Sequence, residues 1–164
     1  MADVTNSKLF DINKDIQQLK DVLVVLVKTE WNAEVVDELE KGCLKVFGEY
    51  NIQTKTIIVP GAIEIPFAIQ QYAANRSALS AFIALGCVIR GGTPHFEYVC
   101  QSVTQGVTQL NLSLSVPVIF GVLTLDTLEQ AKERTGGIHG HKGEEAAITA
   151  IKMMILNKQL KASH

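Results

Sequence analysis

Runs of apolar residues recur along the chain, and segments with apolar positions at helical spacing separate them. The runs at 21–28, 54–59, 79–88 and 116–123 have the length and β-branched content typical of strands buried on both faces. Pro117 favours the beginning of the last run, because proline is tolerated at the start of a strand. The pattern therefore predicts four buried strands.

The segments between these runs predict helices, since their apolar residues recur every three or four positions. The first helix follows Asn32, whose side chain we expect to cap it. Further helices are predicted from about 64 to 74, from 94 to about 110 and from about 143 to 157. Strands and helices thus alternate along most of the chain.

Residues 1–15 and the segment from 126 to 143 do not follow this alternation of strands and helices. Residues 126–129 (Asp-Thr-Leu-Glu) resemble a capping box and predict a short helix that ends at about Arg134. Glycines between 136 and 143 predict a flexible connection. Residues 1–15 are polar and predict an arm or an edge strand, which leaves 16–164 as one domain.

The predicted order of elements is β-α-β-α-β-α-β-α-α. Such alternation implies a single three-layer α/β/α domain with a central four-stranded, mostly parallel sheet of the flavodoxin-like kind. Ligands of open α/β sheets bind at the carboxyl ends of the strands. The residues with the most distinctive chemistry lie near those ends: Trp31, Gly61 to Glu64, Cys87 to His95, and Phe120 to Thr124.

Composition excludes several classes of protein. With 164 residues, 47% hydrophobic and 20% charged, the chain suits one domain with a sizeable core. A net charge of −2 and scattered basic residues argue against a nucleic-acid partner. No apolar run approaches the length of a membrane span, and the N-terminus lacks an apolar signal core. Three cysteines without CxxC spacing fit buried thiols in a reducing cytoplasm.

The third strand runs into Gly91-Gly92-Thr93-Pro94, which we call the glycine turn, and His95 opens the next helix. Such a turn presents free backbone N–H groups and the positive end of a helix dipole to an anion. A histidine beside an anion suits proton transfer on a phosphorylated small molecule. The alternative is a tight turn with a surface histidine; the convergence of four strand ends favours the site. Pro94 should stiffen the turn.

Other residues at the strand ends have both a functional and a structural interpretation. Trp31, the single tryptophan, can stack on a planar heterocycle or act as a helix staple or interface anchor. Glu64 can accept hydrogen bonds from ligand hydroxyl groups or serve the helix dipole. Arg134 and Lys142 can bind phosphate or interact with helix ends.

Metal and nucleotide motifs are weak or missing. His139 and His141 are two positions apart, and no nearby cysteine or aspartate completes a ligand set, so we predict no metal site. The GxGxxG and GxxxxGK[ST] fingerprints are absent, which argues against a classical dinucleotide site or a P-loop.

Several motifs together closely resemble the lumazine synthase family over about residues 20–158: Trp31-Asn32, Pro60 to Pro66, Gly86 to Val99, Pro117 to Gly121 and Lys142-Gly143. The resemblance implies a transferase of riboflavin biosynthesis without cofactor or metal. The family condenses 5-amino-6-(D-ribitylamino)uracil with (S)-3,4-dihydroxy-2-butanone 4-phosphate, and phosphate and water leave. It implies a homopentamer or a shell of twelve pentamers, with the product passed to riboflavin synthase.

By motif, the resemblance also assigns roles to residues. Trp31 would stack on the pyrimidine, Glu64 would bind ribityl hydroxyl groups, and His95 would transfer protons. The substrate-binding residues that it implies in one subunit are Trp31, Ala62, Ile63, Glu64, Cys87, Val88, Ile89, Gly92 and Thr93.

Within that set, the backbones of Val88 and Ile89 would pair with the pyrimidine, and Gly92 and Thr93 would hold the phosphate. Cys87 stands where many relatives have threonine; we expect its side chain to pack inward and not to act as a nucleophile.

The resemblance implies that a neighbouring subunit completes the site with Phe120, Arg134 and Lys142. Arg134 would bind phosphate as a catalytic residue, and Lys142 would contact the pyrimidine. Alternative functions are a riboflavin synthase of the archaeal kind, a flavin or lumazine carrier, and a shell-forming structural protein. The short connection between Gly137 and Lys142 is compatible with the sixty-subunit shell.

Overall fold

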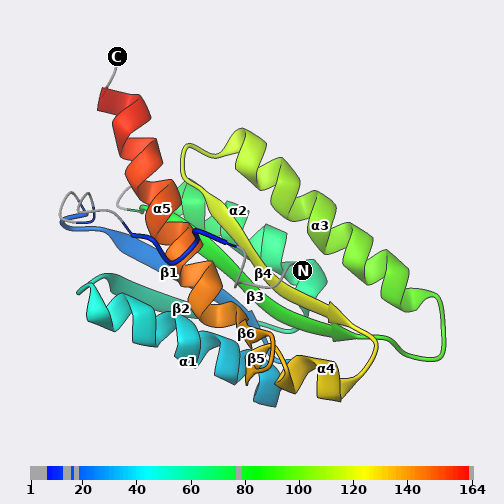
Figure 1. The fold of residues 1–164 in the computed structure, drawn as a ribbon. Coiled ribbons are helices and arrows are strands. Elements are labelled where there is room, and N and C mark those ends of the chain that lie inside the picture. Colours follow the sequence, from blue (N-terminus) through cyan, green and yellow to red (C-terminus); the bar gives the residue numbers. More distant parts are fainter. Residues whose placement is uncertain (1–6, 13–15, 17–18, 77–78, 163–164) are drawn as a thin grey trace.

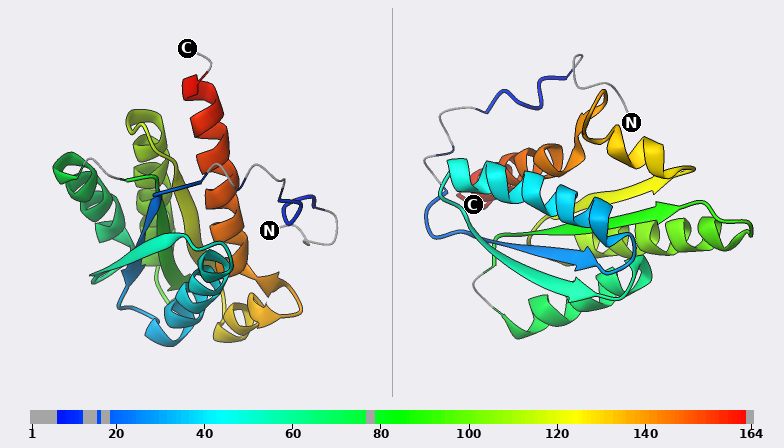
Figure 2. Two further views of the ribbon diagram at one scale, coloured as in Figure 1. Left: turned by 90° about the vertical axis from the view of Figure 1, so that its left-hand side faces the viewer. Right: turned by 90° about the horizontal axis from the view of Figure 1, so that it is seen from below.

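The computed structural model describes residues 7–12, 16, 19–76 and 79–162. A sheet lies between two helical layers, as Figures 1 and 2 show. The three-layer α/β arrangement that the sequence predicts is confirmed, and the chain's regular alternation of strands and helices explains it.

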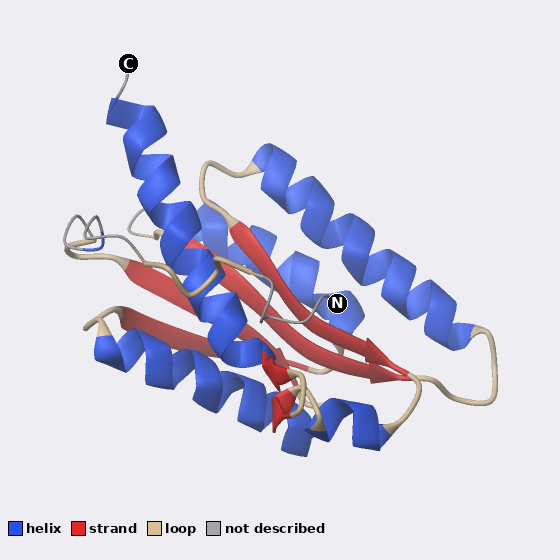
Figure 3. Ribbon diagram, viewed as in Figure 1, coloured by secondary structure: helices blue, strands red, loops and turns tan. Residues whose placement is uncertain are grey.

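The sheet contains β1 (Leu23–Thr29), β2 (Gln53–Val59), β3 (Ala81–Ile89) and β4 (Val118–Leu125). All pairs are parallel, and the strand order is β2-β1-β3-β4, drawn in red in Figure 3. The strands β1, β3 and β4 begin two residues later than the predicted apolar runs. A strand begins where its backbone pairs with a neighbouring strand, and the apolar run can begin before that point. The order reverses between β1 and β3, and β4 is an edge strand.

Two pairs of helices cover the two faces of the sheet. On one face, α1 (Ala33–Glu49) and α5 (Lys142–Ala162) bury the larger core; on the other, α2 (Ile65–Asn75) and α3 (His95–Ser113) bury the second. Alternate side chains of the central strands enter opposite cores, so these strands are apolar at consecutive positions. Leu26 packs with the first core and Val27 with the second.

The two helices of the larger core approach closely at glycine. A Cβ atom at Gly143 would lie 2.1 Å from the carbonyl oxygen of Leu39, and one at Gly42 would lie 2.2 Å from Cε1 of His141. The Cys43 thiol donates to the Gly143 carbonyl at 3.2 Å. The crossing fixes the start of α5, where Lys142 lies.

Asn32 precedes α1 as predicted, but its side chain does not cap the helix. Its backbone is left-handed (φ 56°), which directs the side chain away from the helix N-terminus. Its Nδ2 instead donates to the carbonyl oxygen of Cys87 at 2.8 Å. The predicted cap is therefore wrong, and Asn32 joins the ends of β1 and β3.

The predicted capping box is confirmed in part. Thr127 accepts a hydrogen bond from the backbone N–H of Gln130 at the start of α4 (Leu128–Lys132). The helix ends before Arg134, because the chain turns there into a hairpin of β5 (Thr135–Gly137) and β6 (Gly140–His141).

That hairpin replaces the predicted flexible connection. Gly136 and Gly140 have φ of 114° and 74°, values that favour glycine, so these glycines serve a defined turn. The backbone N–H of Lys142 donates to the carbonyl of Arg134 at 2.8 Å and closes the base of the hairpin. The two cationic residues are therefore held side by side.

The described part of the N-terminal arm, residues 7–12, contains no strand. Leu9, Ile12 and Ile16 pack against the larger core, and Lys152 of α5 donates to the carbonyl of Lys8 at 2.7 Å. Residues 1–6 and 13–15 lie outside the described residues.

Candidate active site

A cavity of about 420 Å³ lies at the carboxyl ends of β1, β2 and β3, the end marked by the arrowheads in Figure 3. We call it the strand-end cavity. This is the place where open α/β sheets bind ligands, beside the reversal of strand order, and the volume suits a small heterocycle with a side chain. Its lining residues are Thr29, Trp31, Asn32, Gly61, Ala62, Ile63, Glu64, Cys87, Val88, Ile89, His95 and Val99.

The loop after β1 holds Trp31 at the mouth of this cavity. The backbone N–H of Trp31 donates to the carbonyl of Pro60 at 3.3 Å, and the buried Thr29 hydroxyl donates to the Trp31 carbonyl at 3.2 Å. The backbone is thereby fixed, while the indole side chain is 73% exposed. A flat apolar ring is thus presented to a ligand by a constrained loop.

Glu64 lies beside this ring, at the end of the short helix η3 (Ala62–Glu64). A Cβ atom at Gly61 would lie 3.0 Å from Oε2 of Glu64 and 3.5 Å from Cδ1 of Trp31. Glycine at position 61 therefore lets the carboxylate and the indole approach each other. The pair combines a stacking surface with an acceptor for hydroxyl groups.

The end of β3 offers free backbone to the cavity. Its pairing with β1 stops at Leu85, whereas its pairing with β4 continues to Ile89. Asn32 uses the Cys87 carbonyl on the side that faces β1. Backbone groups of alternate residues in a parallel strand point to the same neighbour, so those of Ile89 face the cavity side and those of Val88 face β4. Ile89 can thus pair with the edge of a heterocycle.

The Cys87 side chain packs inward, as predicted, and is 4% exposed. Burial raises the pKa of its thiol to about 11. The thiol is therefore protonated at neutral pH and is a poor nucleophile.

The glycine turn is open around its glycines. Neither Gly91 nor Gly92 has a left-handed φ, and a Cβ atom at either would meet no heavy atom within 4 Å. The conformation of the turn itself therefore does not require glycine, and both positions have free space around them. Gly92 and Thr93 are exposed but do not line the cavity, whereas His95, the first residue of α3, does.

Phe120, Arg134 and Lys142 lie elsewhere, in a second cavity of about 660 Å³ along β4, the β4-edge cavity. None of the three lines the strand-end cavity, because the strand order puts β4 at the edge of the sheet. The Phe120 side chain is 41% exposed there. The structure thus separates the predicted site residues into two groups.

The two cations of the β4-edge cavity have firm partners. The Arg134 guanidinium donates to the Gln130 carbonyl at 2.9 Å, and Nζ of Lys142 contacts both carboxylate oxygens of Glu145 at 2.6 and 2.8 Å. Lys142 is 6% exposed. Removing either Lys142 or Glu145 would leave the other charge buried and unpaired, so both positions are sensitive to substitution.

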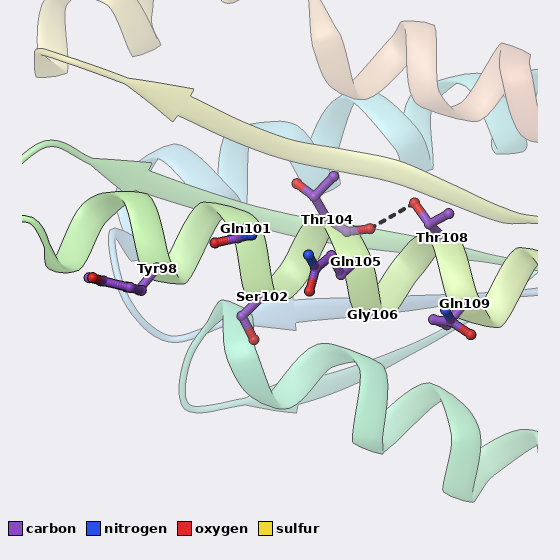
Figure 4. A pocket seen from close by; sticks show the side chains of 8 residues that line it. All are labelled: Tyr98, Gln101, Ser102, Thr104, Gln105, Gly106, Thr108 and Gln109. Carbon is purple, nitrogen blue, oxygen red and sulfur yellow. Dashed lines mark hydrogen bonds between the residues drawn. The ribbon is translucent and has the colours of Figure 1, made fainter.

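A third hollow, of about 680 Å³, runs along α3 and is shown in Figure 4. Its side chains are uncharged amides and hydroxyl groups, with the Tyr98 phenol as the only titratable one. The Thr108 hydroxyl donates to the Thr104 carbonyl at 2.9 Å, marked by a dashed line. This hollow lacks the acid, base or cation that a reaction needs.

Within the described residues, no group of three or more His, Cys, Asp or Glu side chains is placed to hold a metal. His139 lies 3.8 Å from a Glu133 oxygen, and His141 packs against Gly42. No helix in the described part of the chain is long and apolar enough to cross a membrane.

Sequence reasoning missed the contacts of Asn32 and Glu145. Only the spacing of Glu145, three residues after Lys142 on a helix, could have indicated its partner. The bond from Asn32 depends on a left-handed backbone that the sequence pattern does not reveal.

Comparison with known proteins agrees with this geometry. The family model described as 6,7-dimethyl-8-ribityllumazine synthase matches residues 21–158. A protein of that name from Porphyromonas gingivalis is 49% identical over 142 residues, 85% of this chain and 88% of that protein. Another, from Parabacteroides distasonis, is 41% identical over 152 residues, 91% and 94% of the two chains. The chain belongs to the 6,7-dimethyl-8-ribityllumazine synthase family.

Proposed function

We propose that this protein condenses 5-amino-6-(D-ribitylamino)uracil with (S)-3,4-dihydroxy-2-butanone 4-phosphate to give 6,7-dimethyl-8-ribityllumazine, in riboflavin biosynthesis. Family membership supports this reaction. The observation that carries it is one cavity that joins the Trp31 ring, the Glu64 carboxylate and the His95 imidazole. The aromatic ring of the first substrate needs a stacking surface, its polyol chain needs a hydrogen-bond acceptor, and its reacting amine needs a group that transfers protons.

The pyrimidine binds between the indole of Trp31 and the end of β3. Stacking on Trp31 holds the ring, and the Ile89 backbone pairs with its edge, while the ribityl chain follows Ala62 and Ile63 to the Glu64 carboxylate. Holding both reactants in fixed orientation lowers the barrier by proximity.

The phosphorylated ketone binds at the glycine turn. The N–H groups of Gly92 and Thr93, with the N-terminus of α3, bind its phosphate. The substrate amine and ketone form an imine with loss of water, and His95 moves the protons of this step near neutral pH. Loss of phosphate and ring closure with a second loss of water then complete the product.

Departure of phosphate requires positive charge, and the lining of the strand-end cavity contains no lysine or arginine. We propose that a neighbouring copy supplies it through Arg134 and Lys142 of its β4-edge cavity, together with Phe120. The exposed Trp31 and Phe120 side chains suit such an interface. Each site is then shared by two subunits, and activity requires assembly.

The same proposal includes a homopentamer in the cytoplasm. The short hairpin between Arg134 and Lys142 is compatible with closure of twelve pentamers into a sixty-subunit shell. Its product would pass to riboflavin synthase. Light scattering on the purified protein tests the assembly, with masses near 5 or 60 chains as the expected values.

The test of the reaction is to mix the two substrates with purified protein and to follow lumazine fluorescence and phosphate release. A carrier would bind the product without forming it. A riboflavin synthase of the archaeal kind would form riboflavin from lumazine alone. The proposal fails if the two substrates give no lumazine above the uncatalysed rate.

A further inference from the structure

Arg90 is the residue immediately before the glycine turn, and its side chain has three partners. Its Nε donates to Oδ1 of Asp126 at 2.7 Å, and its Nη1 donates to the Glu97 carboxylate. The guanidinium carbon lies 4.2 Å from the centroid of the Phe96 ring. Its backbone N–H also donates to the Leu125 carbonyl at 2.8 Å.

These contacts connect both ends of the glycine turn. Arg90 follows β3, whereas Phe96 and Glu97 belong to the first turn of α3. Within the described structure, the turn has few other restraints: its glycines are open, and no side chain caps α3. Exposed ion pairs contribute little one by one, but a planar guanidinium held by two carboxylates and a ring has one orientation.

The network also reaches the segment that carries Arg134. The backbone N–H of Asp126 donates to Oε1 of Gln130 at 2.9 Å, and the carbonyl of Gln130 accepts from Arg134 at 2.9 Å. Arg90 is thus connected through Asp126 and Gln130 to the cation that we assign to the neighbouring site.

The net charge of the cluster around Arg90 indicates that Arg90 positions the turn and does not itself bind phosphate. Two carboxylates, Asp126 and Glu97, surround the single positive charge of Arg90, so the cluster has a net charge of about −1 at neutral pH. Contact with Arg90 lowers the pKa of Glu97, which is therefore ionised at that pH. The cluster has no surplus positive charge to attract an anion.

We propose that Arg90 is a positioning residue that holds the glycine turn in the conformation that binds phosphate. The proposal rests on the proposed function, which places the phosphate at Gly92 and Thr93. Arg90 does not touch the substrate; it acts through the turn that it closes.

The test is Arg90→Gln in the full assembled protein, with Arg76→Gln, an exposed arginine just after α2, as the matched control. We expect the KM for the phosphorylated substrate and the dissociation constant of inorganic phosphate to rise about tenfold, because a loosened turn misplaces its N–H groups. The KM for the pyrimidine should change by less than about twofold. Glu97→Gln should have the same selective effect, and the double variant should lose little more than either single one.

Two results would overturn the proposal: phosphate affinity equal in Arg90→Gln and Arg76→Gln, or equal losses for both substrates with a lowered melting temperature. Calorimetric titration with inorganic phosphate needs no turnover. A wild-type protein that binds phosphate but forms no lumazine therefore contradicts the proposed reaction and still tests Arg90. A wild-type protein that binds no phosphate overturns the role of Arg90.

Discussion

The strand-end cavity and the β4-edge cavity belong to one sheet but have complementary chemistry. The first presents an indole, a carboxylate and an imidazole, with no lysine or arginine in its lining. The second contains Arg134 and Lys142. Each cavity therefore has part of the chemistry that the proposed elimination of phosphate requires, and neither has all of it.

The two cavities also differ in how their side chains are held. Lys142 is buried against Glu145, and Arg134 is fixed to Gln130, whereas Trp31 and His95 are exposed. The cations are therefore ordered before any ligand arrives, and the ligand itself has to cover the exposed rings.

The largest effect is expected for Arg134→Ala. Removing the positive charge beside the departing phosphate should lower kcat/KM by about 10²- to 10³-fold, the range for loss of one electrostatic partner of a transition state. Steady-state kinetics of lumazine formation measure it, with Arg76→Ala as a control that removes an exposed arginine. Near-normal activity of Arg134→Ala would mean that the strand-end cavity is self-sufficient.

A mixture of two inactive variants tests the sharing directly. Gly92→Asp puts a carboxylate where we propose that phosphate binds, and its side chain has room because nothing lies within 4 Å of a Cβ there. Random co-assembly with Arg134→Ala should restore about a quarter of wild-type activity, since one site in four combines two intact halves. Activity no greater than the sum of the separate variants would place both halves in one subunit.

A smaller loss, about tenfold to 10²-fold in kcat/KM, is expected for His95→Ala. His95 is exposed at the cavity, so water can replace part of its proton transfer, whereas water does not replace the positive charge of Arg134. If His95→Ala is more damaging than Arg134→Ala, proton transfer and not charge limits the reaction.

The smallest effect is expected for Cys87→Thr. The thiol has a pKa of about 11 because it is buried, and the contact of Cys87 with Asn32 is made by its backbone carbonyl. Activity should stay within about twofold of wild type. Rapid alkylation of Cys87 near neutral pH, measured by mass spectrometry, would contradict the inert thiol.

The apolar runs predict the sheet well because each central strand is buried on both faces. Of the residues that the family motifs imply for one subunit, those from Trp31 to Ile89 and His95 line the strand-end cavity, whereas Gly92 and Thr93 do not. The sequence does not reveal that Asn32 bonds to Cys87, since that bond needs a left-handed backbone and a neighbouring strand. The sequence also does not reveal the hairpin of β5 and β6, which follows Arg134 and which the glycines led us to predict as a flexible connection. Glycine-rich composition does not distinguish disorder from a turn that requires positive φ.

The placement of Trp31 has a practical consequence. It is the only tryptophan in the chain, and it lies at the mouth of the strand-end cavity. Its emission therefore originates from the place where we propose that the heterocycle binds, and stacking would quench it. The protein thus contains its own optical probe, with which ligand occupancy can be followed without a label and separately from turnover.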